Sequence, residues 1–116
     1  MLLERRFDTE IIDRTKAYII ENLEKNESVE HIAKKVFFSA HYLRHLFKKR
    51  AGVTIQEFKN RERLKKAKLL LLSGENKIVE IAAACGYESP AYFSEVFVKE
   101  MGMNPTDFRK TMRGEM

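Results

Sequence analysis

The sequence predicts an all-α fold of seven helices, in which two similar subdomains are joined by a long central helix. Helix breakers are few, with two prolines and five glycines among 116 residues. No alternating run rich in Val, Ile and Thr, which would indicate a strand, stands out. Apolar residues instead recur with helical spacing, and the same pattern occurs twice along the chain.

The repeat is visible when the sequence is compared with itself. Residues 39–58 align without gaps with residues 89–108 at an offset of 50, and upstream the pairing continues at an offset of 49. The second copy therefore has one additional residue in its turn. A duplication of this length predicts that both copies form the same local structure. Six of the aligned pairs are identical: Ser39 and Ser89, Tyr42 and Tyr92, Phe47 and Phe97, Lys49 and Lys99, Gly52 and Gly102, Phe58 and Phe108.

In the first subdomain, residues 9–54, we expect three helices. The first covers residues 9–24, Ser28 caps the second, and the third lies between Ser39 and Gly52. Serine hydroxyls accept backbone N–H groups at helix starts, and glycine commonly ends a helix. Residues 1–8 are expected to be an N-terminal tail or linker. In the first helix Ile12, Ile19 and Leu23 share one face, with Ile11, Thr15 and Tyr18 beside them. The apolar positions with helical spacing in the other two helices are Val29, Ile32, Ala33, Val36, Leu43, Leu46 and Phe47.

Thr54 and Glu57 form a capping-box pattern that opens the long connecting helix, residues 55–73. We interpret its leucines as core rather than as a zipper. The second subdomain, residues 74–113, repeats the first. Its helix starts and turns are marked by Gly86, Ser89 with Pro90, Gly102, and Asn104 with Pro105. Because Phe37 stands in the first turn where Gly86 stands in the second, we expect the two turns to differ in backbone conformation.

Positive charge is concentrated in the middle of the chain. The net charge is +5, yet residues 39–72 alone carry ten Lys and Arg against two acids. A basic face of this kind suits a phosphate-containing partner, although a solvated helix face is the alternative. A single cysteine, Cys85, indicates a reducing compartment. No apolar run approaches the roughly 20 residues of a membrane helix and no secretory signal is recognisable, so we expect a cytoplasmic protein.

The helix after Ser39 presents a polar outer face. Because Leu43, Leu46 and Phe47 point inward, the helical period places four residues on the outer face: His41, Arg44, His45 and Lys48. Long donor side chains on such a helix can read base edges in a major groove. Basic residues near the helix end would instead reach phosphates and set the register. The predicted base-reading residues are His41, Arg44 and His45, and the predicted phosphate contacts are Lys48, Lys49 and Arg50.

The connecting helix suggests how two such units would be spaced. Residues 55–72 would span about 27 Å at about 1.5 Å per residue. Successive major-groove faces on one side of B-DNA lie about 34 Å apart. One monomer would then place two recognition helices in adjacent major grooves and read two boxes about one turn apart. The same helix adds basic residues to the expected positive surface: Lys59, Arg61, Arg63, Lys65, Lys66 and Lys68.

Three segments resemble the DNA-binding domain of AraC/XylS-type transcription regulators: IAKKVFFSAHYLRHLFKKRAG at 32–52, RLKKAKLLL at 63–71 and IAAACGYESPAYFSEVFVKEMGMNPTDFR at 81–109. The resemblance implies a homeodomain-like arrangement of two helix-turn-helix units that bind double-stranded DNA, in a bacterial regulator whose sensor or receiver domain is missing from this chain. It also implies a contact with RNA polymerase. By position, it adds Ala91, Ser94 and Glu95 as base-reading residues and Ser39, Ser89 and Lys99 as phosphate contacts.

The second subdomain departs from the family pattern. Glu95 stands where the family usually has a basic residue, and Val98 stands where it usually has a lysine. An acid can accept from cytosine N4 but repels phosphates, so we expect the second subdomain to bind DNA weakly by itself. The alternative function is a helical protein-docking module that contacts RNA polymerase or another regulator.

Catalysis and metal binding are not expected. The sequence shows no nucleophile with a matching base and no glycine-rich phosphate loop, so we predict that the chain is not an enzyme and has no cofactor. His41 and His45 stand four residues apart, but no nearby acid or cysteine completes a metal site. Cys85 aligns with an inner-face position, so we expect it to be buried.

Overall fold

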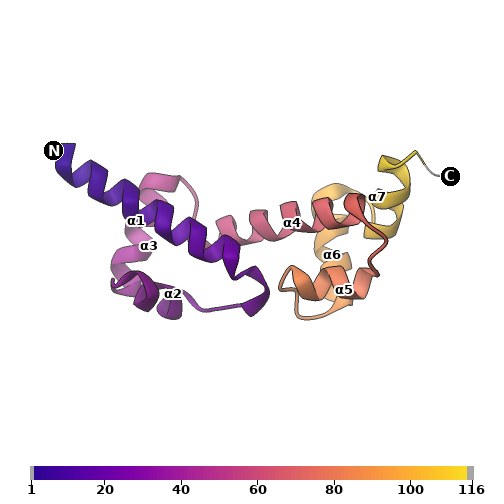
Figure 1. Cartoon of the computed structure of the whole chain (residues 1–116), viewed down its shortest axis with the longest axis horizontal. Coiled ribbons are helices and arrows are strands. Elements are labelled where there is room, and N and C mark those ends of the chain that lie inside the picture. Colours follow the sequence, from indigo (N-terminus) through magenta and orange to yellow (C-terminus); the bar gives the residue numbers. More distant parts are fainter. Residues whose placement is uncertain (1, 115–116) are drawn as a thin grey trace. The chain divides into compact units, whose positions relative to one another are not determined.

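A computed structural model describes residues 2–114 of the chain, with side chains from Arg6 onward (Figure 1). This part contains seven α-helices and one short 3-10 helix and no strand, as the sequence predicts. The chain divides into two compact units, unit 1 (residues 1–61) and unit 2 (residues 62–116). The connecting helix α4 (Ile55–Ser73) begins in unit 1 and ends in unit 2.

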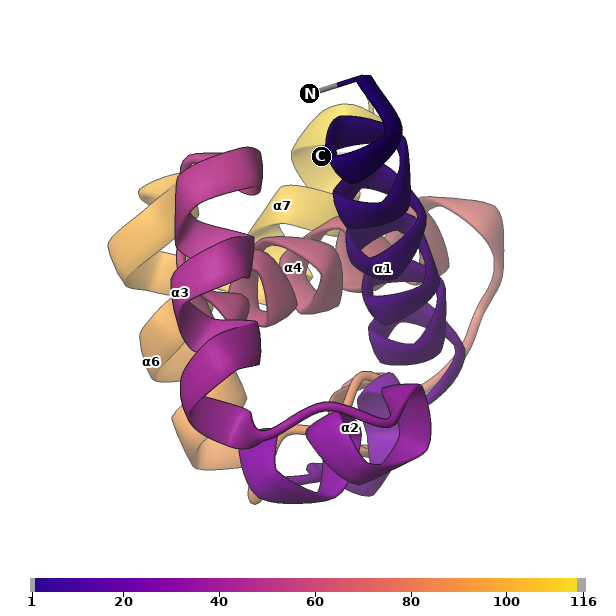
Figure 2. The same ribbon diagram turned by 90° about the vertical axis from the view of Figure 1, so that its left-hand side faces the viewer.

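Unit 1 contains α1 (Leu2–Glu21), the 3-10 helix η1 (Leu23–Lys25), α2 (Val29–Val36) and α3 (Ala40–Ala51). The helices α1, α2 and α3 all pack against one another (Figure 2). The first helix starts at Leu2 rather than at residue 9, and its expected last turn is the separate 3-10 helix. Of the apolar positions with predicted helical spacing, Val29 is only partly buried and packs against the core, and α4 adds Ile55. The buried core residues are Ile11, Ile12, Ile19, Leu23, Ile32, Ala33, Val36, Leu43, Leu46, Phe47 and Ile55.

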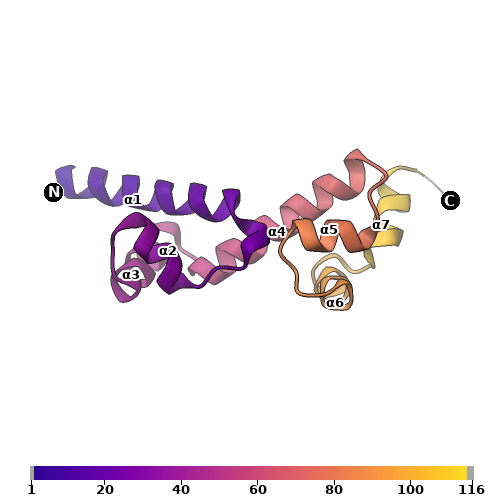
Figure 3. The same cartoon turned by 60° about the horizontal axis from the view of Figure 1, so that its bottom comes forward.

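Unit 2 contains the second part of α4 together with α5 (Ile78–Ala84), α6 (Pro90–Met101) and α7 (Pro105–Met112). A short turn joins α5 to α6, and α6 packs against both α5 and α7 (Figure 3). Cys85 is fully buried, as expected. The core is built mainly from small and aromatic residues: Ala67, Leu71, Ile81, Ala82, Cys85, Phe93, Phe97 and Phe108.

Five of the predicted helix starts are confirmed by their hydrogen bonds. At each start a side-chain oxygen accepts the backbone N–H of the residue three positions later, which satisfies one of the free donors of the first turn. In the capping box, Glu57 N–H donates to Thr54 Oγ1 at 3.0 Å, and Thr54 N–H donates to Glu57 Oε1 at 3.4 Å. The oxygens come from Ser28, Ser39, Thr54, Ser89 and Asn104.

The two turns differ in length by one residue, but they share one backbone conformation at Phe37 and Gly86, so the difference expected at this position is not found. Phe37 has φ 68° and Gly86 has φ 87°, both in the left-handed region. The hydrogen bonds also correspond. Phe37 N–H donates to the Lys34 carbonyl at 3.2 Å, and Gly86 N–H donates to the Ala83 carbonyl at 3.1 Å. Unit 1 therefore has a phenylalanine in the left-handed position at which unit 2 has a glycine.

Candidate nucleic-acid interface

The outer face of α3 presents the three predicted base-reading residues. His41, Arg44 and His45 are all exposed, and the two imidazole rings lie 4.5 Å apart between centroids. The inner face is held by Leu43 and Phe47, which are fully buried. Since packing fixes one face of α3, the opposite face has a defined direction and is available to a partner.

Arg44 is bound to an acid of the neighbouring helix. Its Nη2 donates to Glu30 Oε1 of α2 at 2.8 Å, while both side chains remain more than half exposed. The hydrogen bond from Arg44 lowers the pKa of the Glu30 carboxyl below its ordinary value. Glu30 stands 14 residues before Arg44, and no sequence pattern pointed to this pair.

The predicted phosphate contacts of unit 1 are exposed but differ in their contacts. The Ser39 hydroxyl caps α3, and Lys48 Nζ donates to the Gly52 carbonyl at 3.5 Å. Lys49 is exposed. Arg50 Nη2 instead donates to Asp8 Oδ2 of α1 at 2.8 Å, and the Asp8 side chain is 15% exposed. Arg50 thus ties α3 to α1, and binding a phosphate would compete with that ion pair.

The equivalent face of α6 has a different chemistry. Ala91 and Glu95 are exposed and Ser94 is half-buried. Val98 on α6 and Val79 on α5 are also about half exposed, at 46% and 54%. Of the two predicted phosphate contacts, Ser89 is half-buried and caps α6, and Lys99 is exposed. The base-facing positions of α6 therefore carry no positive charge.

Several basic residues of the middle segment point into the protein, which corrects their assignment to a positive surface. Lys59 and Arg63 are each only 7% exposed. Lys59 Nζ donates to the Glu27 carbonyl at 2.8 Å, and Lys66 Nζ donates to the Ala84 carbonyl at 2.9 Å. Burial lowers the pKa of the Arg63 guanidinium. Lys59 and Lys66 thus satisfy backbone carbonyls, and Arg63 is buried, so none of the three forms part of an exposed surface for phosphates.

The internal donors follow the sequence repeat. Lys59 aligns with Arg109, and the carbonyl of Glu27 aligns with that of Asn76, to which Arg109 Nη2 donates at 2.8 Å. Arg109 Nε also donates to the Leu71 carbonyl at 2.8 Å. In unit 1 a cation of α4 thus holds the loop before α2, and in unit 2 a cation of α7 holds the loop before α5. This role was not predicted from the sequence, although the alignment of Lys59 with Arg109 offered a signal.

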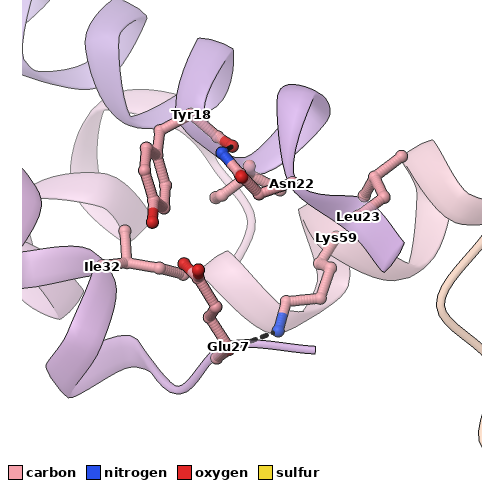
Figure 4. A pocket seen from close by; sticks show the side chains of 7 residues that line it. Tyr18, Asn22, Leu23, Glu27, Ile32 and Lys59 are labelled. Carbon is pink, nitrogen blue, oxygen red and sulfur yellow. Dashed lines mark hydrogen bonds between the residues drawn. The ribbon is translucent and has the colours of Figure 1, made fainter. Parts of the chain in front are cut away.

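A small pocket in unit 1 surrounds part of this contact (Figure 4). Its volume of about 10 Å³ corresponds to a single water molecule, so it is too small for an organic ligand. The Tyr18 hydroxyl is hydrogen-bonded to the Glu27 carboxylate, which together with burial raises the pKa of Tyr18 to about 12. The pocket is lined by Tyr18, Ile19, Asn22, Leu23, Glu27, Ile32 and Lys59.

Two further kinds of site are not found in the described residues. Three or more His, Cys, Asp or Glu side chains nowhere gather in a way that could hold a metal ion. Within the same residues, no helix combines the length and the apolar character required to cross a membrane. The polar face of α3, with its counterpart on α6, is therefore the main candidate site.

The family model for a helix-turn-helix domain matches residues 17–111. The transcriptional activator RhaR of Yersinia pestis is 44% identical over 68 residues, which cover 59% of this chain and 23% of the relative. The transcriptional regulator YijO of Escherichia coli is 30% identical over 106 residues, which cover 91% of this chain and 38% of the relative. The matched parts thus span well under half of these relatives.

A solved structure shows the same arrangement of helices. The C-terminal domain of AraT, a response regulator from Geobacillus stearothermophilus, is 34% identical and superposes with a TM-score of 0.82, covering 87% of this chain and 84% of that one. The matched relatives are transcription regulators. This chain belongs to the helix-turn-helix DNA-binding domains of the AraC/XylS-type transcription regulators.

Proposed function

We propose that α3 is the principal recognition helix and reads bases in a major groove through His41, Arg44 and His45. The observation that carries this proposal is the division of α3 into a buried apolar face and an exposed face of donors. Arginine binds guanine O6 and N7 with two hydrogen bonds, and neutral histidine can donate to or accept from a base edge. Ser39, Lys48 and Lys49 contact the adjacent phosphates. Arg50 also contacts a phosphate when it exchanges its ion pair with Asp8 for that phosphate.

Unit 2 supplies a second, weaker contact in the adjacent major groove. Ala91 can pack against a thymine methyl group, Ser94 can donate or accept, and Glu95 can accept from cytosine N4. Ser89 and Lys99 contact phosphates. The target is then an asymmetric site of two boxes about ten base pairs apart. The domain acts in the cytoplasm as the DNA-binding output of a larger bacterial regulator, whose sensor or receiver domain controls it.

Selection from a random duplex library, with this chain alone at near-physiological salt, tests the proposal. Enrichment of two boxes about ten base pairs apart supports a monomer that reads adjacent grooves. Enrichment of a single box restricts specificity to α3. Salt-sensitive binding without any enriched sequence contradicts base reading by this domain alone.

A protein-docking role for α6 is the second candidate. It is favoured by the half-exposed Val79 on α5 and Val98 on α6, since the centres of protein interfaces are more apolar than the rest of the surface. RNA polymerase or another regulator would be the partner. Salt separates the two functions, because binding through several phosphates weakens steeply as salt rises, whereas an apolar protein contact does not.

A further inference from the structure

The bond between Glu30 and Arg44 connects the two helices of the first helix-turn-helix. Glu30 lies in the first turn of α2, and its Oε1 accepts one N–H from Arg44 Nη2 at 2.8 Å. A guanidinium carries five N–H groups, so four remain for other acceptors. The pair is exposed, with 52% of the Arg44 side chain and 61% of the Glu30 side chain accessible. An exposed pair of this kind contributes little to folding stability.

Unit 2 has no equivalent of this bond. By the offsets of the repeat, Val79 stands at the position of Glu30 and Ser94 at the position of Arg44. The acid and the arginine therefore occur together in the copy with the basic recognition helix and are both replaced in the other copy. The fold of a helix-turn-helix unit thus forms without the bond, and a role in folding does not account for it.

We propose that Glu30 is a positioning residue for base recognition by Arg44. A free arginine side chain has many rotamers, and fixing one of them before binding reduces the conformational entropy lost on binding. By accepting one N–H, the Glu30 carboxylate fixes the direction of the guanidinium and leaves the other N–H groups for a base edge. This inference rests on the proposed function, since it requires that Arg44 reads a base.

The test compares base discrimination, not affinity alone. The duplex enriched by selection and its single-base variants are titrated with the wild type, Arg44→Ala, Glu30→Ala and the double variant. Arg44→Ala should relax discrimination at one base position by about ten-fold or more. Glu30→Ala should reduce discrimination at that same position by about two- to five-fold, the range expected for an exposed pair. In the Arg44→Ala background, removal of Glu30 should have no further effect there.

Two control variants separate positioning from charge. Glu24→Ala removes an equivalent exposed acid from η1 of the same unit and should leave discrimination unchanged while it strengthens binding to any duplex. Glu30→Gln keeps an acceptor oxygen and should retain more discrimination than Glu30→Ala. Thermal unfolding of each variant shows that the fold is intact.

Unchanged discrimination in Glu30→Ala, or an equal loss in Glu24→Ala, would overturn the role of Glu30 while leaving base reading by Arg44 in place. A loss that persists in the Arg44→Ala background would overturn it as well. If Arg44→Ala itself relaxes no base position, base reading by Arg44 is wrong and the positioning role falls with it. The two failures are therefore distinguishable.

Discussion

At the scale of single residues, Phe37 adopts a backbone conformation that its side chain disfavours. Its φ of 68° lies in the left-handed region, which costs a non-glycine residue roughly 1–2 kcal/mol. The side chain is 84% exposed, so its burial offsets little of that cost. The other turn of the same form uses Gly86, which adopts this region freely.

We therefore expect Phe37→Gly to be more stable than Phe37→Ala by about 1 kcal/mol, since both variants remove the ring and only glycine relieves the backbone. Chemical denaturation of the two variants measures the difference. Gly102→Ala is the converse control, because Gly102 has φ 78° and a Cβ there would meet no atom within 4 Å. It should be destabilised by a similar amount. Equal stability of Phe37→Gly and Phe37→Ala would show that the turn carries no strain.

The sequence predicted which side chains of α3 are exposed, but not which acids pair with its arginines. The helical period placed His41, Arg44 and His45 outside and Leu43, Leu46 and Phe47 inside, as the structure has them. That these residues read bases stays a prediction. The acids that bind Arg44 and Arg50 were not predicted, because each pair joins two helices 14 and 42 residues apart in the chain. Packing between helices, which local periodicity does not encode, brings them together.

At the scale of elements, α4 buries a residue at every fourth position, including two cations: Ile55, Lys59, Arg63, Ala67 and Leu71. Of its other leucines, Leu64 and Leu70 pack on the core of unit 2, whereas Leu69 and Leu72 are exposed, at 63% and 42%. The core interpretation of the leucines is thus confirmed only in part. Charge counted along the sequence overestimated the basic surface, because lysine and arginine stems can pack inside while their heads reach a backbone carbonyl.

The role of Lys66 is testable on this basis. Its ammonium group holds the carbonyl of Ala84, the last residue of α5, where a cation also interacts favourably with the helix dipole. Lys66→Met should lower the free energy of unfolding by about 1–2 kcal/mol, as for loss of a partly buried hydrogen bond to a charged group. The salt dependence of DNA binding should not change.

Lys65→Met is the matched control for this prediction. Lys65 is the exposed neighbour on α4, so its removal should leave stability within about 0.5 kcal/mol of the wild type. Denaturant titrations and salt-dependent DNA binding would be measured on both variants. A weaker salt dependence in Lys66→Met, with unchanged stability, would place Lys66 on the DNA surface instead.

Helix ends were predictable where a side chain marks them and not elsewhere. Serine, threonine and asparagine caps fixed the starts of α2, α3, α4, α6 and α7. The start of α1 was placed too late, at residue 9, whereas the helix already includes Leu2. The start of α5 is unmarked. There Lys77 is the N-cap, and its backbone N–H donates to Glu80 Oε1 at 3.2 Å.

At the scale of the whole molecule, the two units carry different charge. Unit 1 has 13 Lys and Arg against 9 Asp and Glu, a net charge of +4, and unit 2 has 9 against 8, a net charge of +1. The basic residues of unit 2 include Lys66 and Arg109, which are occupied with backbone carbonyls. The duplication thus preserved the packing contacts in both copies while their outer faces diverged. Attraction to phosphates is accordingly concentrated in unit 1.

A substitution at Glu95 can give unit 2 the positive charge that its outer face lacks. It is exposed on α6 at the place of His45 in the repeat, so Glu95→Arg replaces a repelling charge with an attracting one. We expect tighter binding to an unrelated duplex at low salt. The slope of log affinity against log salt should steepen by about 0.9 for each additional phosphate that the arginine neutralises. Glu95→Gln is the matched control, because it removes the repelling charge without adding a cation, and it should have the smaller effect. Equal effects of the two variants would mean that the arginine makes no contact with phosphate. No effect of Glu95→Arg would mean that α6 does not lie against DNA and would favour its role as a protein-docking surface.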